Sequence, residues 1–252
     1  MPRFAANLTM LFSDLPFPAR FQAAFEAGFS GVEFLFPYDH PVAQIKTALD
    51  DCGLPLVLFN TPAGDWHAGD RGFAAVPGRG DAFETGLAQA LNYAKVLKPQ
   101  YIHILSGIAA GPSARACFVD NLRKATTHAP YQNFLIEPIN PVDMPGYFLN
   151  DYTLAREIIA EISAPNLGLQ FDAYHAQRIT GDALAAWPEN RPITRHIQVA
   201  GAPGRHEPIP SDIDYAAFFR QLDREGYAGF ISGEYNPVAT TQDGLGWING
   251  DV

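Results

Sequence analysis

Short apolar runs alternate with longer amphipathic runs along this chain, and the alternation repeats eight times. The apolar runs are rich in β-branched and aromatic residues, which is typical of parallel strands that are buried on both faces. The predicted strands are Phe4–Leu8, Gly31–Phe36, Pro55–Asn60, Tyr101–Leu105, Phe134–Pro138, Gly168–Asp172, Arg195–Val199 and Gly229–Glu234. The runs between them predict helices over Pro18–Ala27, Ala43–Asp51, Asp81–Leu97, Ser113–His128, Asp151–Ile162, Asp182–Trp187 and Tyr215–Glu225. This order predicts an α/β fold of parallel βα units.

Two architectures can hold eight such units: an open doubly wound sheet and a closed (β/α)8 TIM barrel. An open sheet would be expected to carry a glycine-rich phosphate turn after its first strand. The segment Thr9–Asp14 follows that strand and contains no glycine. The length of 252 residues also suits a barrel, because eight units usually occupy about 250 residues. We therefore expect a single TIM barrel domain over residues 1–252.

Charge and cysteine content restrict the class of partner. The 17 Lys and Arg residues against 27 Asp and Glu give a formal net charge of −10, which disfavours nucleic acid and anionic membrane surfaces. The chain contains no run of eighteen apolar residues that could span a membrane, and no uninterrupted apolar core typical of a signal peptide follows Met1. Cys52 and Cys117 lie too far apart for a disulfide framework. We expect a cytoplasmic protein that acts on a small molecule, with a homo-oligomer left open.

Polar side chains end most of the apolar runs: Glu33, Asn60, His103, Glu137, Asp172, Gln198 and Glu234. In a barrel, the carboxyl ends of the strands surround one bowl, so the last four of these residues should converge there. Three carboxylates at close range oppose one another's ionisation, so either some bind protons or a cation lies among them. We favour the cation. An all-oxygen set of Glu137, Asp172, Gln198 and Glu234 suits one Mg²⁺ or Mn²⁺ ion, with Co²⁺ as an alternative, better than Zn²⁺.

Further polar residues are candidates for binding a substrate. His175 lies three residues after Asp172, in the predicted loop. Arg205 has a planar guanidinium that could hold a substrate oxygen or carboxylate, although it could instead pair with Glu207 on the surface. His103, inside an apolar strand, is either a substrate contact or a core histidine. Asn7, at the end of the first strand, is assigned to the same bowl.

The segment 63–80 is a long, glycine-rich excursion after the third predicted strand. Loops of this length are uncommon in compact domains and often act as active-site lids. Trp66 and Phe73 could exclude water from a small bowl, so Trp66 is added to the candidate substrate contacts. The alternative is a surface insertion without a role in binding.

Several segments together resemble one known family. They are Phe4–Phe12 (FAANLTMLF), Gly31–Pro37 (GVEFLFP), Leu135–Asn140 (LIEPIN), Gln170–His175 (QFDAYH), Pro203–Pro208 (PGRHEP), Gly233–Tyr235 and Gly244–Trp247. These motifs resemble the hydroxypyruvate isomerase family, which includes 2-oxo-tetronate isomerases and belongs to the xylose-isomerase-like TIM barrels. The resemblance covers essentially the whole chain.

The resemblance implies roles for particular residues. Glu137, Asp172, Gln198 and Glu234 match the family's divalent-metal ligands, and Glu137 and Glu234 also match its catalytic pair. His175 and Arg205 match substrate-contacting positions of related ketose epimerases. Departures lie near the substrate bowl: Gly201-Ala202 stands where the family usually has an Asp-Asn pair, and 209–214 differs from the usual glycine-rich turn.

These residues predict a metal-dependent isomerase acting on an α-hydroxy carbonyl substrate, either hydroxypyruvate or a 2-oxo-tetronate. One glutamate would remove a proton to give an enediolate, and a glutamate would return it to the neighbouring carbon. Returning the proton to the same carbon from the opposite face would instead make a ketose 3-epimerase acting on ribulose, fructose or tagatose. The acidic charge disfavours a metal-dependent endonuclease, and a non-enzymatic binding barrel would show no isotope exchange.

Overall fold

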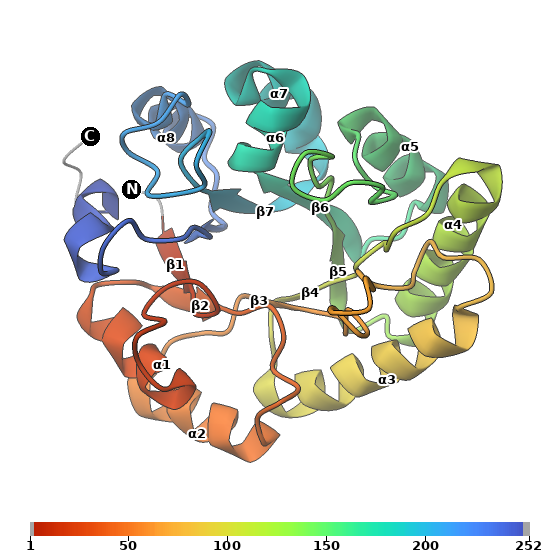
Figure 1. Ribbon diagram of the computed structural model, residues 1–252, viewed down its shortest axis with the longest axis horizontal. Helices are drawn as coiled ribbons and strands as arrows, with labels where there is room; N and C mark the ends of the chain where they lie inside the picture. The colour runs from red at the N-terminus through yellow and green to blue at the C-terminus, as the bar shows by residue number, and fades with distance from the viewer. Residues whose placement is uncertain (1–2, 249–252) are drawn as a thin grey trace.

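The computed structural model describes residues 3–248 and contains an eight-stranded parallel sheet that is rolled into a barrel (Figure 1). Its strands are β1 (Arg3–Asn7), β2 (Gly31–Glu33), β3 (Leu58–Asn60), β4 (Tyr101–His103), β5 (Asn133–Ile136), β6 (Leu167–Asp172), β7 (Thr194–Val199) and β8 (Phe230–Gly233). Their order is β2-β1-β8-β7-β6-β5-β4-β3. The ends of the expected domain, residues 1–2 and 249–252, lie outside the described residues.

The two outermost strands of that order meet and close the ring. A parallel bridge joins Val32 of β2 to Leu56, just before β3. The Val57 amide donates to the Val32 carbonyl at 2.8 Å, and the Phe34 amide donates to the Leu58 carbonyl at 3.2 Å. The prediction of a (β/α)8 barrel rather than an open doubly wound sheet is therefore confirmed.

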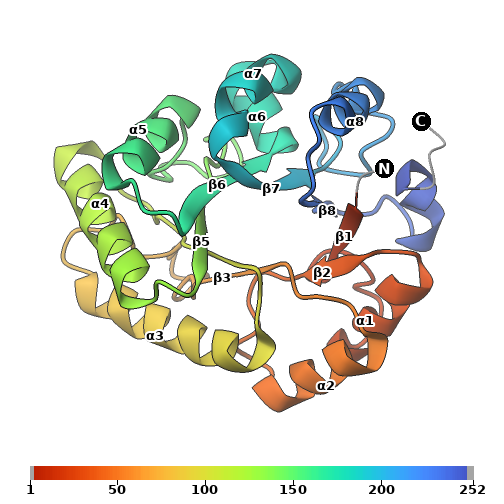
Figure 2. The same cartoon turned by 180° about the vertical axis from the view of Figure 1, so that it is seen from behind.

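Helices surround the strand ring on the outside, as the views from both ends show (Figures 1 and 2). They are α1 (Phe17–Glu26), α2 (Val42–Cys52), α3 (Gly80–Leu97), α4 (Gly111–His128), α5 (Tyr152–Ile162), α6 (Ala173–Thr180), α7 (Ala183–Asn190) and α8 (Tyr215–Arg224), with 3₁₀ helices η1 (Arg191–Ile193) and η2 (Gln242–Ile248). The seven predicted helices are confirmed to within a few residues at each end. None of the helices described over 3–248 has the length and apolar character needed to cross a membrane.

Helix α6 was not predicted, and the assignment of His175 to a loop is wrong. Asp172 is both the last residue of β6 and the N-cap of α6, and its Oδ1 accepts a hydrogen bond from the Tyr174 amide at 2.8 Å. The strand therefore passes into the helix without a connecting loop, and Gly181, with φ of +82°, ends the helix. His175 consequently lies in the first turn of a helix, which fixes its position more firmly than a loop would.

The interior of the barrel is apolar toward the amino ends of the strands and polar toward their carboxyl ends. Ala5, Leu135 and Phe230 belong to a small core cluster that is separate from the large core between strands and helices. Successive side chains of a strand point to opposite faces, so residues two apart share a face. Leu135 and Glu137 therefore share the inward face, as do Ala5 and Asn7. The strands thus build an apolar floor beneath a layer of polar side chains.

The second half of segment 63–80 is attached to the barrel. Gly72 forms an antiparallel bridge with Ser106, and the Ala75 amide donates to the Ser106 carbonyl at 2.7 Å. Asn121 of α4 donates to the Ala74 carbonyl at 2.9 Å. The attachment depends on glycine, because a Cβ at Gly72 would lie 2.4 Å from Leu105 Cβ. Whether this segment acts as a lid stays a prediction.

We predict that Gly72→Ala destabilises the protein far more than Gly69→Ala. Both glycines have φ of +98°, but a Cβ at position 69 would meet nothing within 4 Å. Gly69→Ala should lower the free energy of unfolding by about 1 kcal/mol, the cost of the backbone conformation alone. Gly72→Ala should cost at least about 3 kcal/mol, because its Cβ also meets the backbone of residue 105. Urea denaturation measures both variants, and equal losses would contradict this close packing.

Candidate active site

The structure brings together the four residues that the sequence predicted to converge. Glu137 follows β5, Asp172 ends β6, Gln198 lies near the end of β7, and Glu234 follows β8. All four are buried, with no more than 7% of any residue's surface exposed. Gln198 donates a hydrogen bond through Nε2 to Glu234 Oε2, and Asp172 is the register partner of Gln198 in the sheet. The carboxyl ends of four neighbouring strands thus form one polar cluster.

The carboxylates of this cluster resist ionisation. Burial raises the pKa of Glu137 well above its ordinary value, and the neighbouring Glu234 and Asp172 raise it further. Burial also raises the pKa of Glu234 to about 8, against the opposing effect of the Arg205 guanidinium. The pKa of Asp172 is likewise raised by burial, with Arg205 again opposing the rise. Such a cluster needs either bound protons or positive charge.

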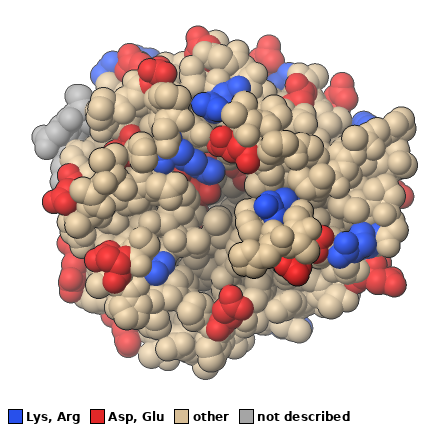
Figure 3. All heavy atoms as spheres, in the orientation of Figure 1, with Lys and Arg blue, Asp and Glu red and all other residues tan. Residues whose placement is uncertain are grey.

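Arg205 supplies positive charge directly to the carboxylates. Its Nη2 lies 3.0 Å from Glu234 Oε1 and 3.4 Å from Asp172 Oδ2. The alternative of a surface pair with Glu207 is not what the structure shows, because Glu207 Oε1 accepts from the Val238 amide at 3.0 Å. Lys or Arg side chains and acidic side chains both line the hollow at the centre of this face of the molecule (Figure 3).

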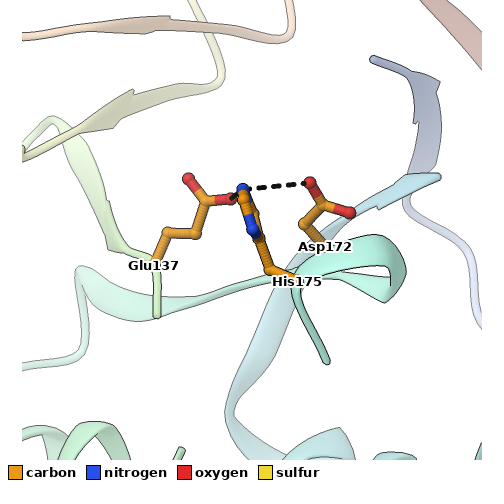
Figure 4. A group of neighbouring side chains, drawn as sticks. All are labelled: Glu137, Asp172 and His175. Atoms are coloured by element: carbon orange, nitrogen blue, oxygen red, sulfur yellow. Dashed lines mark ion pairs between the residues drawn. The ribbon is translucent and has the colours of Figure 1, made fainter. Parts of the chain in front are cut away.

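His175 points from α6 into the same cluster (Figure 4). Its Nε2 lies 3.7 Å from Asp172 Oδ2 and 3.9 Å from Glu137 Oε1. Burial lowers the pKa of His175 well below its ordinary value, and the positive charge of Arg205 lowers it further. Glu137, Asp172 and His175 offer ligand atoms within 4.8 Å of one another, so this buried group could bind a metal ion.

His103 also faces Glu137. Its Nδ1 lies 3.5 Å from Glu137 Oε2, and burial lowers its pKa to about 3. Neither of its ring nitrogens has a hydrogen-bond partner within residues 3–248. A buried histidine with both nitrogens unpartnered is not a satisfied core residue.

Asn7 and Trp66 lie outside this cluster. Asn7 donates to Glu33 Oε1 at 3.1 Å, and its own Oδ1 accepts from the Thr9 amide. Trp66 is 44% exposed, and the Arg71 guanidinium lies 3.6 Å from the centroid of a Trp66 ring. No hydrogen bond or ion pair in the described part of the chain joins either residue to the clustered carboxylates. Their assignment to the substrate stays a prediction.

Sequence reasoning missed two buried residues that hold the cluster in place. Gln170 donates through Nε2 to Glu137 Oε2 at 2.8 Å and to Gln198 Oε1 at 2.6 Å. His196 Nε2 lies 2.7 Å from Glu33 Oε2. Gln170 precedes Asp172 by two residues on one strand, and His196 precedes Gln198 in the same way. The two-residue period of a strand could therefore have indicated both.

Glu33 accepts hydrogen bonds from the residues that support the carboxylate cluster. Although burial acts to raise it, the pKa of Glu33 lies below its ordinary value because His196 and the Gln198 amide stabilise the carboxylate. The Gln198 Nε2 donates to Glu33 Oε1 at 2.7 Å as well as to Glu234. An amide group between two carboxylates must turn its NH₂ toward them. The oxygen of Gln198 therefore faces Gln170, and two glutamines link Glu137 to Glu234.

We predict that Gln170→Met destabilises the protein. Methionine keeps the length of the side chain but removes both hydrogen bonds, which leaves buried oxygens of Glu137 and Gln198 without this donor. The free energy of unfolding should fall by about 1–3 kcal/mol, the usual cost of buried polar atoms left unsatisfied. The matched control is Gln22→Met on the exposed face of α1, which should change stability by less than about 0.5 kcal/mol. Equal small effects in a denaturant titration would contradict the bridging role.

Comparison with known proteins places the chain in a family. The profile of the family described as xylose isomerase-like TIM barrel matches residues 21–250. A 2-oxo-tetronate isomerase from Cupriavidus necator is 44% identical over 254 residues, which is 98% of each chain. A hydroxypyruvate isomerase from Escherichia coli is 40% identical, with 99% of each chain covered.

Comparison with solved structures points to the same family. A crystal structure described as AP endonuclease, family 2, from Brucella melitensis is 41% identical, with 99% of this chain and 98% of that chain covered and a TM-score of 0.95. A 3-keto-D-glucoside 4-epimerase from Escherichia coli, 19% identical over 99% of each chain with a TM-score of 0.79, shares the fold alone. The chain belongs to the xylose isomerase-like TIM barrel family. Its similarity over the full chain to named isomerases shows, more particularly, that it is an isomerase.

Proposed function

We propose that this protein is a divalent-metal-dependent isomerase that interconverts the carbonyl and hydroxyl positions of a hydroxy-keto acid. The observation that carries the proposal is the cluster of three buried carboxylates, Glu137, Asp172 and Glu234, around the amide of Gln198. The names of the relatives, hydroxypyruvate isomerase and 2-oxo-tetronate isomerase, supply the substrate class. The substrate is thus hydroxypyruvate or a 2-oxo-tetronate.

The donor set of the cluster fits one divalent cation. Three carboxylates with raised pKa values face a single guanidinium, so a further positive charge would stabilise their ionised forms. Glu137, Asp172 and Glu234 would hold the ion through carboxylate oxygens, a set that suits Mg²⁺ or Mn²⁺, with Co²⁺ as an alternative. Gln198 would complete the set through Oε1 once its amide turns away from the orientation in which Oε1 accepts from Gln170. When bound, the cation supplies Lewis-acid stabilisation of negative charge that develops on the substrate oxygens.

Glu137 and Glu234 would remove the substrate proton and return it. Both oxygens of Glu234 are engaged, one by Arg205 and the other by Gln198. Glu137 gives only Oε2 to Gln170, and its Oε1 accepts no hydrogen bond within residues 3–248. Glu137 Oε1 is therefore the better placed atom to take a proton from carbon, and Glu234 can return one. Burial strengthens both roles, since it raises the carboxylates' affinity for a proton.

Arg205 and His175 would orient the substrate. Arg205 adopts φ of +55° in a tight turn whose Gly201 carbonyl accepts from the Arg205 amide at 2.7 Å. Gly201 suits this turn because a Cβ there would lie 2.2 Å from the Glu207 carbonyl oxygen. In this chain the turn therefore leaves no room for a side chain at position 201. Arg205 can then hold the substrate carboxylate beside Glu234.

A ketose 3-epimerase is the second candidate, because the same residues could return a proton to the opposite face of one carbon. The Glu137–Glu234 pair, joined through Gln170 and Gln198, is compatible with either outcome. An endonuclease is disfavoured by the net charge of −10, although one similar structure carries that description.

We predict that Glu137→Gln and Glu234→Gln each lower turnover by about 10²- to 10⁴-fold, the usual contribution of a positioned acid or base. Glutamine keeps the side-chain shape and an amide oxygen but cannot carry the proton. Exposed Glu157 on α5 provides the control, since Glu157→Gln should turn over like the wild type. Mn²⁺ binding is measured in parallel by calorimetry. Near-wild-type turnover in both site variants with metal bound would refute the acid–base assignment.

Isotope exchange should separate the two candidate reactions. The protein is freed of metal with a chelator, reloaded with Mg²⁺, Mn²⁺ or Co²⁺, and incubated in D₂O with hydroxypyruvate, a 2-oxo-tetronate or a free ketose. We expect proton NMR to show metal-dependent deuterium incorporation into a hydroxy-keto acid. Exchange confined to a ketose at one carbon would establish the epimerase instead. Exchange that survives complete metal removal would contradict the metal dependence.

A further inference from the structure

Asn140 has an amide group whose orientation is dictated by the backbone around it. It follows β5 by a few residues, and its Oδ1 accepts hydrogen bonds from the backbone amides of Val142 at 3.1 Å and Asp143 at 3.0 Å. An oxygen is needed to accept two N–H donors, so the Nδ2 group must lie on the opposite side. Asn140 is fully buried, which makes the reversed orientation costly.

The Nδ2 group of Asn140 is directed at His175. It lies 2.7 Å from His175 Nδ1 and also donates to Asp143 Oδ2 at 3.0 Å. The backbone amide of Asn140 lies 3.3 Å from the same ring nitrogen. Two N–H donors therefore converge on His175 Nδ1. A ring nitrogen that accepts hydrogen bonds carries a lone pair and no proton, so the ring carries its one proton on Nε2.

The proton on Nε2 decides what His175 can do in the site. Nε2 is the atom that faces Asp172 Oδ2 at 3.7 Å and Glu137 Oε1 at 3.9 Å (Figure 4). A protonated ring nitrogen has no lone pair to give a metal ion. The distances alone would place His175 in a metal-binding group with Glu137 and Asp172. The hydrogen bonds at Nδ1 instead make Nε2 a hydrogen-bond donor. Neither 3.7 nor 3.9 Å is a hydrogen bond, so this N–H is left for a third group.

Asp143 holds the other side of Asn140. Its Oδ2 accepts from the Tyr174 hydroxyl at 2.7 Å, and Tyr174 is the neighbour of His175 in α6. Arg178, one turn further along that helix, lies 3.9 Å from Asp143 Oδ1. The loop after β5 and the first turns of α6 are therefore joined by polar contacts on both sides of Asn140, which keeps its amide opposite the imidazole.

We propose that Asn140 is a positioning residue that fixes His175 in the Nε2–H form, so that His175 donates a hydrogen bond to a substrate oxygen and stays out of the metal's ligand set. The protonation form follows from the contacts alone. The role of the donor rests on the proposed function, in which an α-hydroxy carbonyl substrate offers oxygen atoms beside Glu137 and Asp172. A matching acceptor is a carbonyl or hydroxyl oxygen of that substrate.

Asn140→Asp tests the proposal by changing one group. The aspartate keeps an Oδ1 for the backbone amides of residues 142 and 143, but it places an oxygen where Nδ2 was. That oxygen faces His175 Nδ1 and should draw the proton there. The double variant Asn140→Asp/Asp143→Asn removes the new repulsion between two carboxylates and serves as the second variant if the single one does not fold.

The readout is ¹⁵N NMR of metal-free protein labelled at its histidines, with the His175→Gln variant used to assign the signal. We expect wild-type His175 to have an unprotonated Nδ1 and a protonated Nε2, and both the single and the double variant to have a protonated Nδ1. A wild-type ring protonated on Nδ1 alone would overturn the proposal, as would a ring unchanged in the folded variants. This measurement needs neither activity nor metal.

Mn²⁺ calorimetry tests the exclusion of His175 from the ligand set. His175→Gln should change the Kd for Mn²⁺ by no more than about tenfold, within the range for residues outside the ligand set, whereas Asp172→Asn should weaken it by more than about 100-fold. A loss for His175→Gln as large as that for Asp172→Asn would overturn this part of the proposal. If wild-type protein binds no Mn²⁺, the proposed function fails, while the NMR result still decides the role of Asn140.

Discussion

Three carboxylates buried at one end of the barrel are the constraint on which the rest of the structure depends. Burial raises the pKa values of Glu137, Asp172 and Glu234, and the negative charges of neighbouring carboxylates raise them further. A site of this kind persists only if each oxygen has a donor or a positive charge nearby. Arg205 and the glutamines beneath the carboxylates meet part of that need, and a divalent cation would meet the rest. The polar upper interior of the barrel follows from the same requirement.

The barrel meets this requirement with amide groups as well as charges. Gln170 donates through its NH₂ group to both Glu137 and Gln198, and Gln198 in turn donates through its own NH₂ group to Glu234. The two glutamines thus link Glu137 to Glu234 without adding charge. Glu33 sets the direction of that link because it holds the NH₂ of Gln198. The amide of Asn140 is oriented in a similar way, with its oxygen toward backbone amides and its NH₂ toward His175. The orientation of uncharged side chains thereby determines which oxygens and nitrogens face the substrate bowl.

The fold and the main cluster were predictable for a shared reason. Parallel strands rich in β-branched and aromatic residues are recognisable from local sequence, and their carboxyl ends meet at one end of a barrel whatever the details of packing. Glu137 and Glu234 could therefore be placed together from sequence, although they are far apart along the chain. Helix α6 could not be placed, because Asp172 both ends a strand and caps the helix, so no loop marks the boundary.

The sequence by itself determined the eight βα units, the convergence of the acidic strand ends and the family to which the motifs point. Only the tertiary structure decided how each polar atom is oriented. His196 meets Glu33 across 163 residues of chain, and His175 meets Asn140 from a different unit. Such contacts depend on strand register and on rotamers in the packed interior, which no local pattern encodes. For that reason the sequence named the carboxylates, while the structure identified the side chains that hold and orient them.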